Sequence, residues 1–193
     1  MQAEVRPGDI VEWGCALSNS EVGDGSVVVQ PFMLILHCTN GMLMNRIVDT
    51  YHIGKKINPA EEESLFLTEE TVEADDRAFW LKVRDTIGTV LSQAYFDTTI
   101  ASLAEAAGTP ITGQIKKVTE MVAARFVLTD PQSEVLFENL VREHDYTKWG
   151  LSNAVTAIAN TTEDYEEASR LEQIGGRIIT LNNTEWSAFN TTS

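Results

Sequence analysis

Two different hydrophobic periods divide the chain. In the first third, apolar residues alternate with polar ones or form continuous runs, which is typical of β-strands. Val27–Cys38 is apolar at both alternating sets of positions, so it predicts a strand covered on both faces. A second strand is predicted over Ile10–Ser18, and the Gly- and Ser-rich stretch 18–26 predicts a hairpin loop between them. Pro31 predicts a bulge or a break, because proline cannot donate a ladder hydrogen bond.

The next segment is less regular. Thr39-Asn40-Gly41 predicts a turn, and Met42–Ile53 fits either a strand or a short helix. Pro59–Asp75 is acidic and poorly periodic, which predicts a loop over its first part.

A helical period begins at Asp76. Asp76–Ala107 predicts a long helix whose buried face consists of Trp80, Val83, Ile87, Val90, Leu91, Ala94 and Tyr95. Further helices are predicted with starts at Thr112, Thr129, Thr147 and Thr162. Gly175-Gly176 predicts the end of the last of these, Arg177–Leu181 a short strand, and Glu185–Phe189 a terminal turn.

This order of elements predicts an α+β protein, with an N-terminal antiparallel β-hairpin or meander followed by a helical C-terminal two-thirds. The length of 193 residues predicts a single domain over 1–193. Within it we distinguish a β-rich part (1–58), an acidic connecting segment (59–75) and a mainly helical part (76–193).

No apolar run reaches the roughly 18 residues that a membrane span needs. The N-terminus shows no basic region followed by an apolar stretch, so no signal peptide is expected. Cys15 and Cys38 are too few for a disulfide scaffold. We therefore expect a cytoplasmic protein with reduced thiols that does not bind membranes.

The charge is strongly acidic and unevenly distributed. The chain has 14 basic and 29 acidic residues, a net charge of −15. Residues 1–58 contain four basic and six acidic residues, and the remaining 135 residues contain ten basic and 23 acidic ones. Such a field repels nucleic acid and anionic membranes at long range, but it leaves room for a local basic patch.

The first third contains the main concentration of cationic side chains: Arg46, His52, Lys55 and Lys56. Gly54 lies directly before the two lysines, and this combination suits contacts to a phosphodiester backbone. The alternative is an ordinary solvated loop.

A second candidate site is the polar tip of the predicted hairpin. It would present hydroxyl, amide and carboxylate groups to a ligand, from Ser18, Asn19, Ser20 and Glu21. The alternative is a loop whose side chains bind their own backbone. The stretch lacks the Gly-Lys-Ser/Thr ending of a phosphate-binding loop.

We expect no metal and no cofactor. Cys15, His37, Cys38 and His52 are zinc-type donors, but no pair of them has the spacing of a zinc site. In the helical part, Thr147 is expected to cap a helix, Trp149 to anchor it in the core, and Asn153 to make a specific hydrogen bond.

Two groups of segments together resemble one family. The first group is Ser18-Asn-Ser-Glu-Val-Gly-x-Gly-Ser, Val29-Gln-Pro-Phe and Cys38-Thr-Asn-Gly-Met42, and the second is Trp149-Gly-x-x-Asn-Ala-Val-Thr156. They resemble a phage- and plasmid-borne family catalogued as domain of unknown function 932, as does His52-Ile-Gly54. Members of that family are usually longer, so the chain is similar to a short member or to a C-terminal part.

The resemblance implies work on phage or plasmid DNA in the cytoplasm of a host cell. The first hypothesis is a non-enzymatic protein of DNA metabolism that binds single-stranded DNA, with an oligomeric annealing and recombination factor as one form of it. The alternative is an acidic protein that mimics nucleic acid and inhibits a basic nucleic-acid-binding protein of the host. An enzyme ranks last, because no nucleophile–base pair, metal spacing or phosphate loop stands out.

Overall fold

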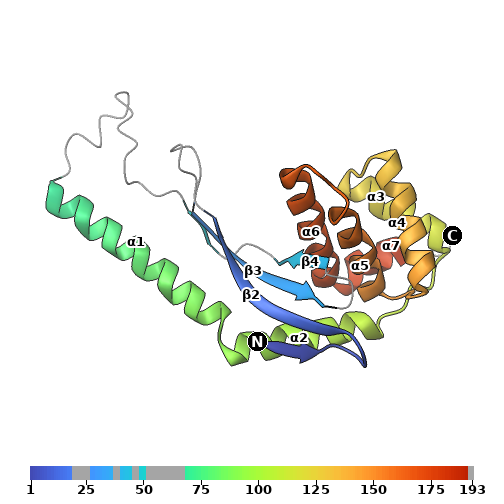
Figure 1. Cartoon of the computed structure of the whole chain (residues 1–193), viewed down its shortest axis with the longest axis horizontal. Helices are drawn as coiled ribbons and strands as arrows, with labels where there is room; N and C mark the ends of the chain where they lie inside the picture. The colour runs from blue at the N-terminus through green and yellow to red at the C-terminus, as the bar shows by residue number, and fades with distance from the viewer. Residues whose placement is uncertain (19–26, 37–39, 45–47, 51–67, 191–193) are drawn as a thin grey trace.

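A computed structural model describes residues 1–18, 27–36, 40–44, 48–50 and 68–190 (Figure 1). The strands are β1 Gln2–Glu4, β2 Ile10–Ser18, β3 Val27–Ile35, β4 Asn40–Leu43 and β5 Val48–Thr50. The helices are α1 Glu69–Val90, α2 Gln93–Gly108, α3 Ile115–Phe126, α4 Asp130–Glu143, α5 Lys148–Ala159, α6 Tyr165–Thr180 and α7 Asn183–Asn190. The predicted α+β layout is confirmed.

The strands form one antiparallel sheet in the order β1-β2-β3-β4, and β5 pairs with the start of β3. The structure gives β2 the predicted bounds. Side chains of Val11, Trp13, Met33 and Ile35 point to the same face, where they pack against Val90 and Phe96 of the first two helices. The opposite face of β3 is less completely covered, because Phe32 and Leu34 are only half-buried.

Pro31 does not interrupt β3, so the predicted bulge or break is wrong. The strand runs in unbroken register past it, with Pro31 opposite Cys15. The Pro31 carbonyl accepts a hydrogen bond from the Met44 N–H at 2.9 Å. The Met44 carbonyl accepts from the Gln30 side-chain amide at 2.6 Å. A side-chain donor therefore supplies the bond that the proline nitrogen cannot make.

The predicted helix over Asp76–Ala107 is two helices. The first begins at Glu69, inside the segment expected to connect the two parts of the chain, and ends at Val90. Ser92 then caps the second helix by accepting a hydrogen bond from the Tyr95 N–H at 3.3 Å. This break resets the helical period, so the predicted buried face is partly wrong. Trp80 and Leu91 are exposed, whereas Phe79 and Phe96 are buried.

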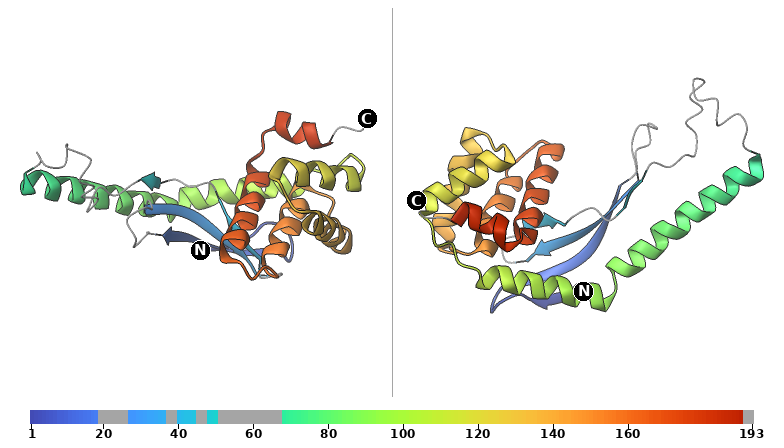
Figure 2. Two further views of the ribbon diagram at one scale, coloured as in Figure 1. Left: turned by 90° about the horizontal axis from the view of Figure 1, so that it is seen from above. Right: turned by 180° about the vertical axis from the view of Figure 1, so that it is seen from behind.

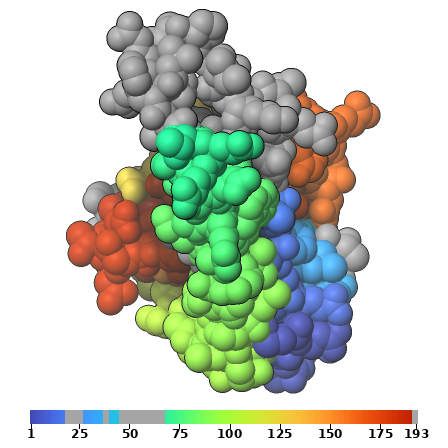
Figure 3. All heavy atoms as spheres, turned by 90° about the vertical axis from the view of Figure 1, so that its left-hand side faces the viewer, coloured from blue at the N-terminus to red at the C-terminus, as the bar shows by residue number. Residues whose placement is uncertain are grey.

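The molecule has two contrasting ends (Figures 1 and 2). Helices α3 to α7 pack together at one end, which we call the helical end (residues 109–190). At the other, α1 extends beside the outer parts of β2 and β3; we call these residues 14–18, 27–31 and 69–90 the arm. Figure 3 faces the arm, with α1 in green running down the middle of the view and the blue strands to its right. Phe79 and Val83 of α1 pack on Val27 and Val29 of β3.

The predicted helix start at Thr129 is confirmed by a full capping box: its hydroxyl accepts from the Gln132 N–H, and the Gln132 side chain accepts from the Thr129 N–H. Thr147 caps α5 as predicted. The other two starts are shifted, because α3 begins after Gln114 and α6 is capped by Asp164.

Gly175-Gly176 does not end a helix, because α6 continues to Thr180. A Cβ atom on Gly176 would overlap the Leu43 carbonyl oxygen, and one on Gly175 would overlap the Thr156 side chain. The two glycines therefore bring α6 into direct contact with β4 and α5. The predicted strand over Arg177–Leu181 is also wrong, because residues 177–180 form the last turn of α6.

Two smaller predictions are also corrected. Asn40 and Gly41 lie in β4 rather than in a turn, and the predicted terminal turn over Glu185–Phe189 lies within α7. The described parts of Met42–Ile53 that form regular structure are strands.

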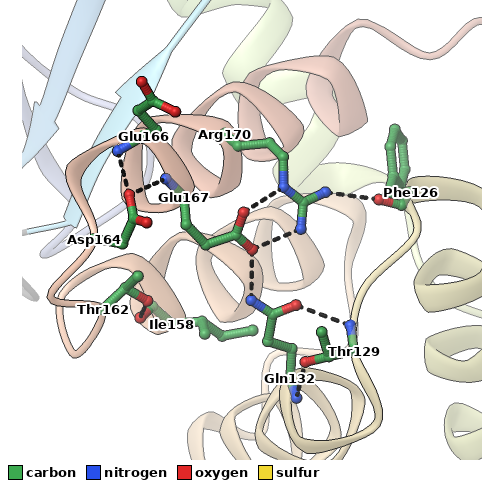
Figure 4. Close-up of polar contacts among 9 residues, drawn as sticks. All are labelled: Phe126, Thr129, Gln132, Ile158, Thr162, Asp164, Glu166, Glu167 and Arg170. Atoms are coloured by element: carbon green, nitrogen blue, oxygen red, sulfur yellow. Dashed lines mark hydrogen bonds and ion pairs between the residues drawn. The ribbon is translucent and has the colours of Figure 1, made fainter.

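A polar network joins the helices of the helical end (Figure 4). Arg170 donates two hydrogen bonds to the Glu167 carboxylate, each at 2.7 Å, and a third to the Phe126 carbonyl at 2.9 Å. Glu167 also accepts from the Gln132 side chain at 2.7 Å. These contacts connect α6 to the end of α3 and the start of α4, and they lower the pKa of Glu167 to about 2.

Among the helices of the described residues, none has both the length and the apolar composition that a membrane span requires.

Candidate functional site: an asparagine-lined pocket

The site residues predicted from the sequence fall on parts of the chain that the structure leaves undescribed. Arg46, His52, Lys55 and Lys56 lie outside the described residues, and so do Asn19, Ser20 and Glu21. Ser18 ends β2, but its side chain is also outside the description. The cationic cluster and the polar hairpin tip therefore stay predictions.

The described residues form a different candidate site, a pocket of about 400 Å³ where the sheet meets α4 and α5. Strand residues Ile35 and Asn40 form one side, and residues of α4 (139–143) and of α5 with its C-terminal cap (150–160) form the other. Arg6, Asp9 and Asp145 complete the wall. This volume lies within the usual range for small-molecule sites.

Asparagines connect the strand side of the pocket to α5. Asn40 donates from its side-chain amide to the Asn153 backbone carbonyl at 3.2 Å, and it accepts from the Asn160 amide at 2.6 Å. Asn40 is buried, so both ends of its amide are held by these bonds.

Another asparagine connects α4 to α5. Asn139 is buried and donates to the Ala154 backbone carbonyl at 3.1 Å. Its side-chain oxygen accepts from Arg142 at 2.9 Å, and Arg142 also donates to Glu143 at 3.1 Å. The amides of Asn40 and Asn139 are therefore used to shape the walls rather than to contact a ligand.

An ion-pair cluster closes the pocket near the start of the chain. Arg6 contacts the carboxylates of Asp9 and Asp145, the latter at 2.7 Å. Asp9 also accepts from the Trp149 indole N–H at 3.0 Å, and Asp145 from the Thr147 hydroxyl at 2.7 Å. Burial works in the opposite direction, but the hydrogen bonds to Asp145 and Asp9 raise the pKa of Arg6. Trp149 is fully buried, which confirms its predicted role as a core anchor.

The charges of the pocket balance with a slight acidic excess. Arg6 and Arg142 face three carboxylates, Asp9, Glu143 and Asp145. Each arginine is already paired with an acid. A phosphate or carboxylate ligand would find little net attraction here, so the pocket suits an uncharged ligand that forms hydrogen bonds.

Asn153 is an uncharged residue of this pocket with unused hydrogen-bonding capacity. Its side-chain oxygen is buried and has no hydrogen-bond partner within the described residues. A buried amide oxygen without a partner costs about 1 to 3 kcal/mol, and a ligand that donates a hydrogen bond to it would remove that cost. The specific side-chain bond expected for Asn153 is therefore unmade at its oxygen within the described residues.

The fold brings together β4 and the start of α5, which lie far apart in the sequence. Asn40 contacts Asn153, and the Ser152 hydroxyl lies 3.8 Å from the Met42 sulfur. More than 100 residues separate these partners in the sequence. Asn40–Met42 and Trp149–Thr156 therefore belong to one structural neighbourhood.

Sequence reasoning missed Arg6, Asn40, Asn139 and Asn160 as parts of a site. Asn139 gave a usable signal, because it occupies the buried face of α4 between Leu136 and Leu140, where an apolar residue is expected. Asn40 gave none, since Asn-Gly is a common turn sequence.

In the described part of the chain, no three His, Cys, Asp or Glu residues are arranged to hold a metal ion. Cys15 is a free, partly buried thiol whose pKa is raised by burial. The other proposed donors, His37, Cys38 and His52, lie outside the described residues. Comparison with protein families, curated proteins and solved structures found no match for this chain.

Proposed function

We propose that this protein is a non-enzymatic binding protein for single-stranded nucleic acid, and that it accepts an unpaired base in the asparagine-lined pocket. The observation that carries the proposal is the buried, unpartnered side-chain oxygen of Asn153 in a pocket whose other amides are fixed. A base edge has N–H donors for such an oxygen and ring acceptors for a guanidinium group.

The composition of the pocket agrees with a base better than with a phosphate. Its side chains are mostly uncharged, and its cations are paired with acids. Arg142 lies at the pocket with a largely exposed side chain, so its guanidinium plane can stack on a base. Backbone phosphates would be left to the predicted cationic residues Arg46, Lys55 and Lys56.

Binding of a labelled single-stranded oligonucleotide, followed by fluorescence anisotropy, tests this function. We expect saturable binding by the wild-type protein and about tenfold weaker binding by Asn153→Ala, since one lost hydrogen bond in a desolvated site costs about 1.4 kcal/mol. Asn183→Ala is the matched control, because Asn183 is an exposed asparagine on α7 away from the pocket. Absence of binding by the wild type, or equal affinities of the two variants, would remove the proposal.

Two further measurements separate base contacts from phosphate contacts. An abasic oligonucleotide keeps the phosphates but should compete poorly if the base enters the pocket. Titrations at about 50 and 200 mM salt report phosphate contacts, since each one steepens the salt dependence. Lys55→Glu/Lys56→Glu should flatten that dependence if the predicted cationic segment contacts the backbone. Unchanged binding by this variant would assign no phosphate contact to the two lysines.

A second candidate function is binding to a basic protein of the host, supported by an acidic groove between α3 and α4. This groove is lined by Glu120, Asp130, Glu134 and Glu138, with Lys116 as its cation. The last three of these acids recur every fourth residue and so form a stripe on one side of α4. The arrangement supports an acidic interaction surface of the kind that mimics nucleic acid.

A charge-reversal experiment tests the second candidate. Proteins retained from a host lysate at low salt by the wild type should be lost with Glu134→Lys/Glu138→Lys. They should be kept with Glu70→Lys/Glu73→Lys, a matched change on the exposed start of α1. Equal retention by both variants would show that the α4 stripe is not the binding surface.

A further inference from the structure

We propose that the outer edge of β2, residues Gly14–Ser18, pairs with the same edge of a second copy of this chain. This inference is independent of the pocket and of the proposed nucleic-acid binding. It starts from the sheet order, in which β1 lies beside only the first part of β2. The pairing reaches Glu12, and the Trp13 N–H donates to the Met1 carbonyl at 2.9 Å.

The hydrogen-bonding direction of each β2 residue follows from two bonds. The Leu36 N–H donates to the Ile10 carbonyl, so even-numbered residues of β2 direct their backbone groups toward β3. Trp13 donates to Met1 on the other side, so odd-numbered residues direct theirs outward. Cys15 and Leu17 consequently present outward N–H and C=O groups, and no strand of the described structure pairs with them.

This edge lacks the features that usually protect a strand from pairing. Exposed edges are commonly blocked by lysine, by other charged side chains, by proline or by a bulge. Residues 13–18 have the sequence Trp-Gly-Cys-Ala-Leu-Ser, which contains none of those residues, and the strand runs in unbroken register with β3. Leu17 is 55% exposed. An uncovered apolar residue on an unpaired edge is a feature of pairing sites.

Residues 13–18 carry no charged side chain, so a second copy can pair with them without placing like charges side by side. The net charge of −15 on each chain still repels a second copy at long range, so a contact between copies has to form through such an uncharged stretch. The edge is also self-complementary, because a two-fold axis at Ala16 places Cys15 opposite Leu17 of the second copy and Leu17 opposite Cys15 of the second copy.

The length of the edge fits this arrangement. Pairing about Ala16 uses residues 14 to 18 of each chain, and it stops at Trp13, whose outward N–H is already bound to Met1. A contact of this size is small compared with the interfaces of permanent dimers. We therefore expect a dimer that forms and dissociates with protein concentration.

Disulfide trapping tests the register directly. In the proposed pairing, Ala16 lies opposite Ala16 of the second copy as a non-hydrogen-bonded pair, a position whose Cα separation of about 4.5 Å permits a disulfide. In a Cys15→Ser/Cys38→Ser background, Ala16→Cys should cross-link rapidly under mild oxidation. Glu12→Cys is the matched control, because it lies on the same side of β2 but opposite Gln2 of β1. Equal cross-linking of the two variants would overturn the proposed register.

Sedimentation equilibrium over a range of concentrations tests the dimer itself. The mass should rise from 21.4 kDa toward twice that value in the wild type. It should stay monomeric in Leu17→Pro, which removes an outward N–H and leaves the bonds to β3 in place, and in Leu17→Lys. Val127→Lys, the same change at a 78% exposed apolar position of the helical end, should dimerise like the wild type.

Circular dichroism of each variant distinguishes a loss of dimerisation from a loss of folding. A monomer at every concentration, with no preferential cross-linking of Ala16→Cys, would overturn the proposal and leave the edge to a strand of a different protein. Dimerisation that is unchanged in Leu17→Lys would also overturn it, because the contact would then lie elsewhere. Neither result depends on whether nucleic acid binds.

Discussion

The helical end and the arm are stabilised in very different ways. Seventeen buried apolar residues form one core in the helical end, whereas the cluster within the arm has four, Val27, Val29, Phe79 and Val83. Of the 22 residues of α1, only Phe79, Val83 and Val90 are buried. The helical end is therefore built around a large apolar core, and α1 depends on its few contacts with the sheet.

This contrast bears on the two binding sites that we propose. The asparagine-lined pocket lies where the sheet meets the helical end, and its walls are fixed by hydrogen bonds between α4, α5 and β4. A rigid support of this kind suits recognition of a small ligand group. The arm offers exposed surface and an unpaired strand edge, which suit contacts with another macromolecule. The following variants test the contrast in order of expected effect.

Truncation of a buried tryptophan should have the largest effect. Trp149 is 0% exposed and donates to Asp9, so Trp149→Ala should lower the free energy of unfolding by about 3 to 5 kcal/mol. Trp80→Ala, on the arm at a position that is 50% exposed, should cost about 1 kcal/mol or less. Urea denaturation followed by circular dichroism measures both.

A milder variant keeps this prediction testable if Trp149→Ala fails to fold. Trp149→Phe retains most of the buried area but loses the bond to Asp9, and it should cost about 1 to 3 kcal/mol. Equal losses for Trp149→Phe and Trp80→Ala would contradict the proposed difference between the two regions.

The same glycine-to-alanine change should have opposite signs in the two regions. Gly176→Ala should lower the free energy of unfolding by about 1 to 3 kcal/mol, because the new methyl group would overlap the Leu43 carbonyl. Gly88→Ala on α1 meets no atom within 4 Å, so alanine's better helix propensity should raise stability by about 0.5 to 1 kcal/mol. Thermal melts of both variants measure the signs. Stabilisation by Gly176→Ala would mean that α6 and β4 are not in close contact.

The polar network of the helical end predicts the next largest effect, a change in the free energy of unfolding that depends on pH. The pKa of Glu167 is lowered from 4.5 to about 2, so its contribution to stability is present above pH 4.5 and is lost as the pH falls toward 2. Glu167→Gln should cost about 1 to 2 kcal/mol at pH 7, after allowance for solvent screening. The difference from the wild type should narrow between pH 4.5 and pH 3 in urea denaturation experiments.

Glu166→Gln is the control for that experiment. Glu166 lies on the same turn of α6, but its side chain is exposed and no described contact uses it. Its replacement should change stability by about 0.5 kcal/mol or less at every pH. A pH dependence of the same size in both variants would attribute the effect to general charge rather than to the network.

The sequence was informative where a structural signal is local. The bounds of β2 and the helix starts at Thr129 and Thr147 depend on alternation and on side-chain caps a few residues away. The order of strands before helices was enough to predict the α+β class. These features need no knowledge of distant parts of the chain.

Other features could not be read locally, because a residue far away in the sequence determines them. Gly175-Gly176 has the composition of a helix end, but α5 and β4 use the missing side chains for close approach. Pro31 is tolerated in β3 because the Gln30 side chain supplies the missing donor to Met44. The same applies to the pocket: Asn153 stood out in the sequence, whereas its partner Asn40 had the sequence signature of a turn.

The smallest predicted effect concerns a carboxylate between the helical end and the sheet. Glu172 on α6 is half-buried, and its side chain lies against the position where Gly41 would place a Cβ atom and near the Phe32 ring. Burial raises the pKa of Glu172, and no described residue donates a hydrogen bond or forms an ion pair with it. Its charge therefore destabilises the folded protein at neutral pH.

Glu172→Gln should accordingly stabilise the protein by about 0.5 kcal/mol at pH 7. Burial penalises only the charged form of Glu172, so the protonated side chain does not destabilise the folded protein at low pH. The gap between variant and wild type should be absent below pH 4.5 and should open as the pH rises through the raised pKa. Urea denaturation at pH 4, 6 and 8 measures this gap. Destabilisation by Glu172→Gln at pH 8 would show that the carboxylate has a favourable partner, and the boundary between α6 and β4 would then be held by charge as well as by the close approach of Gly176.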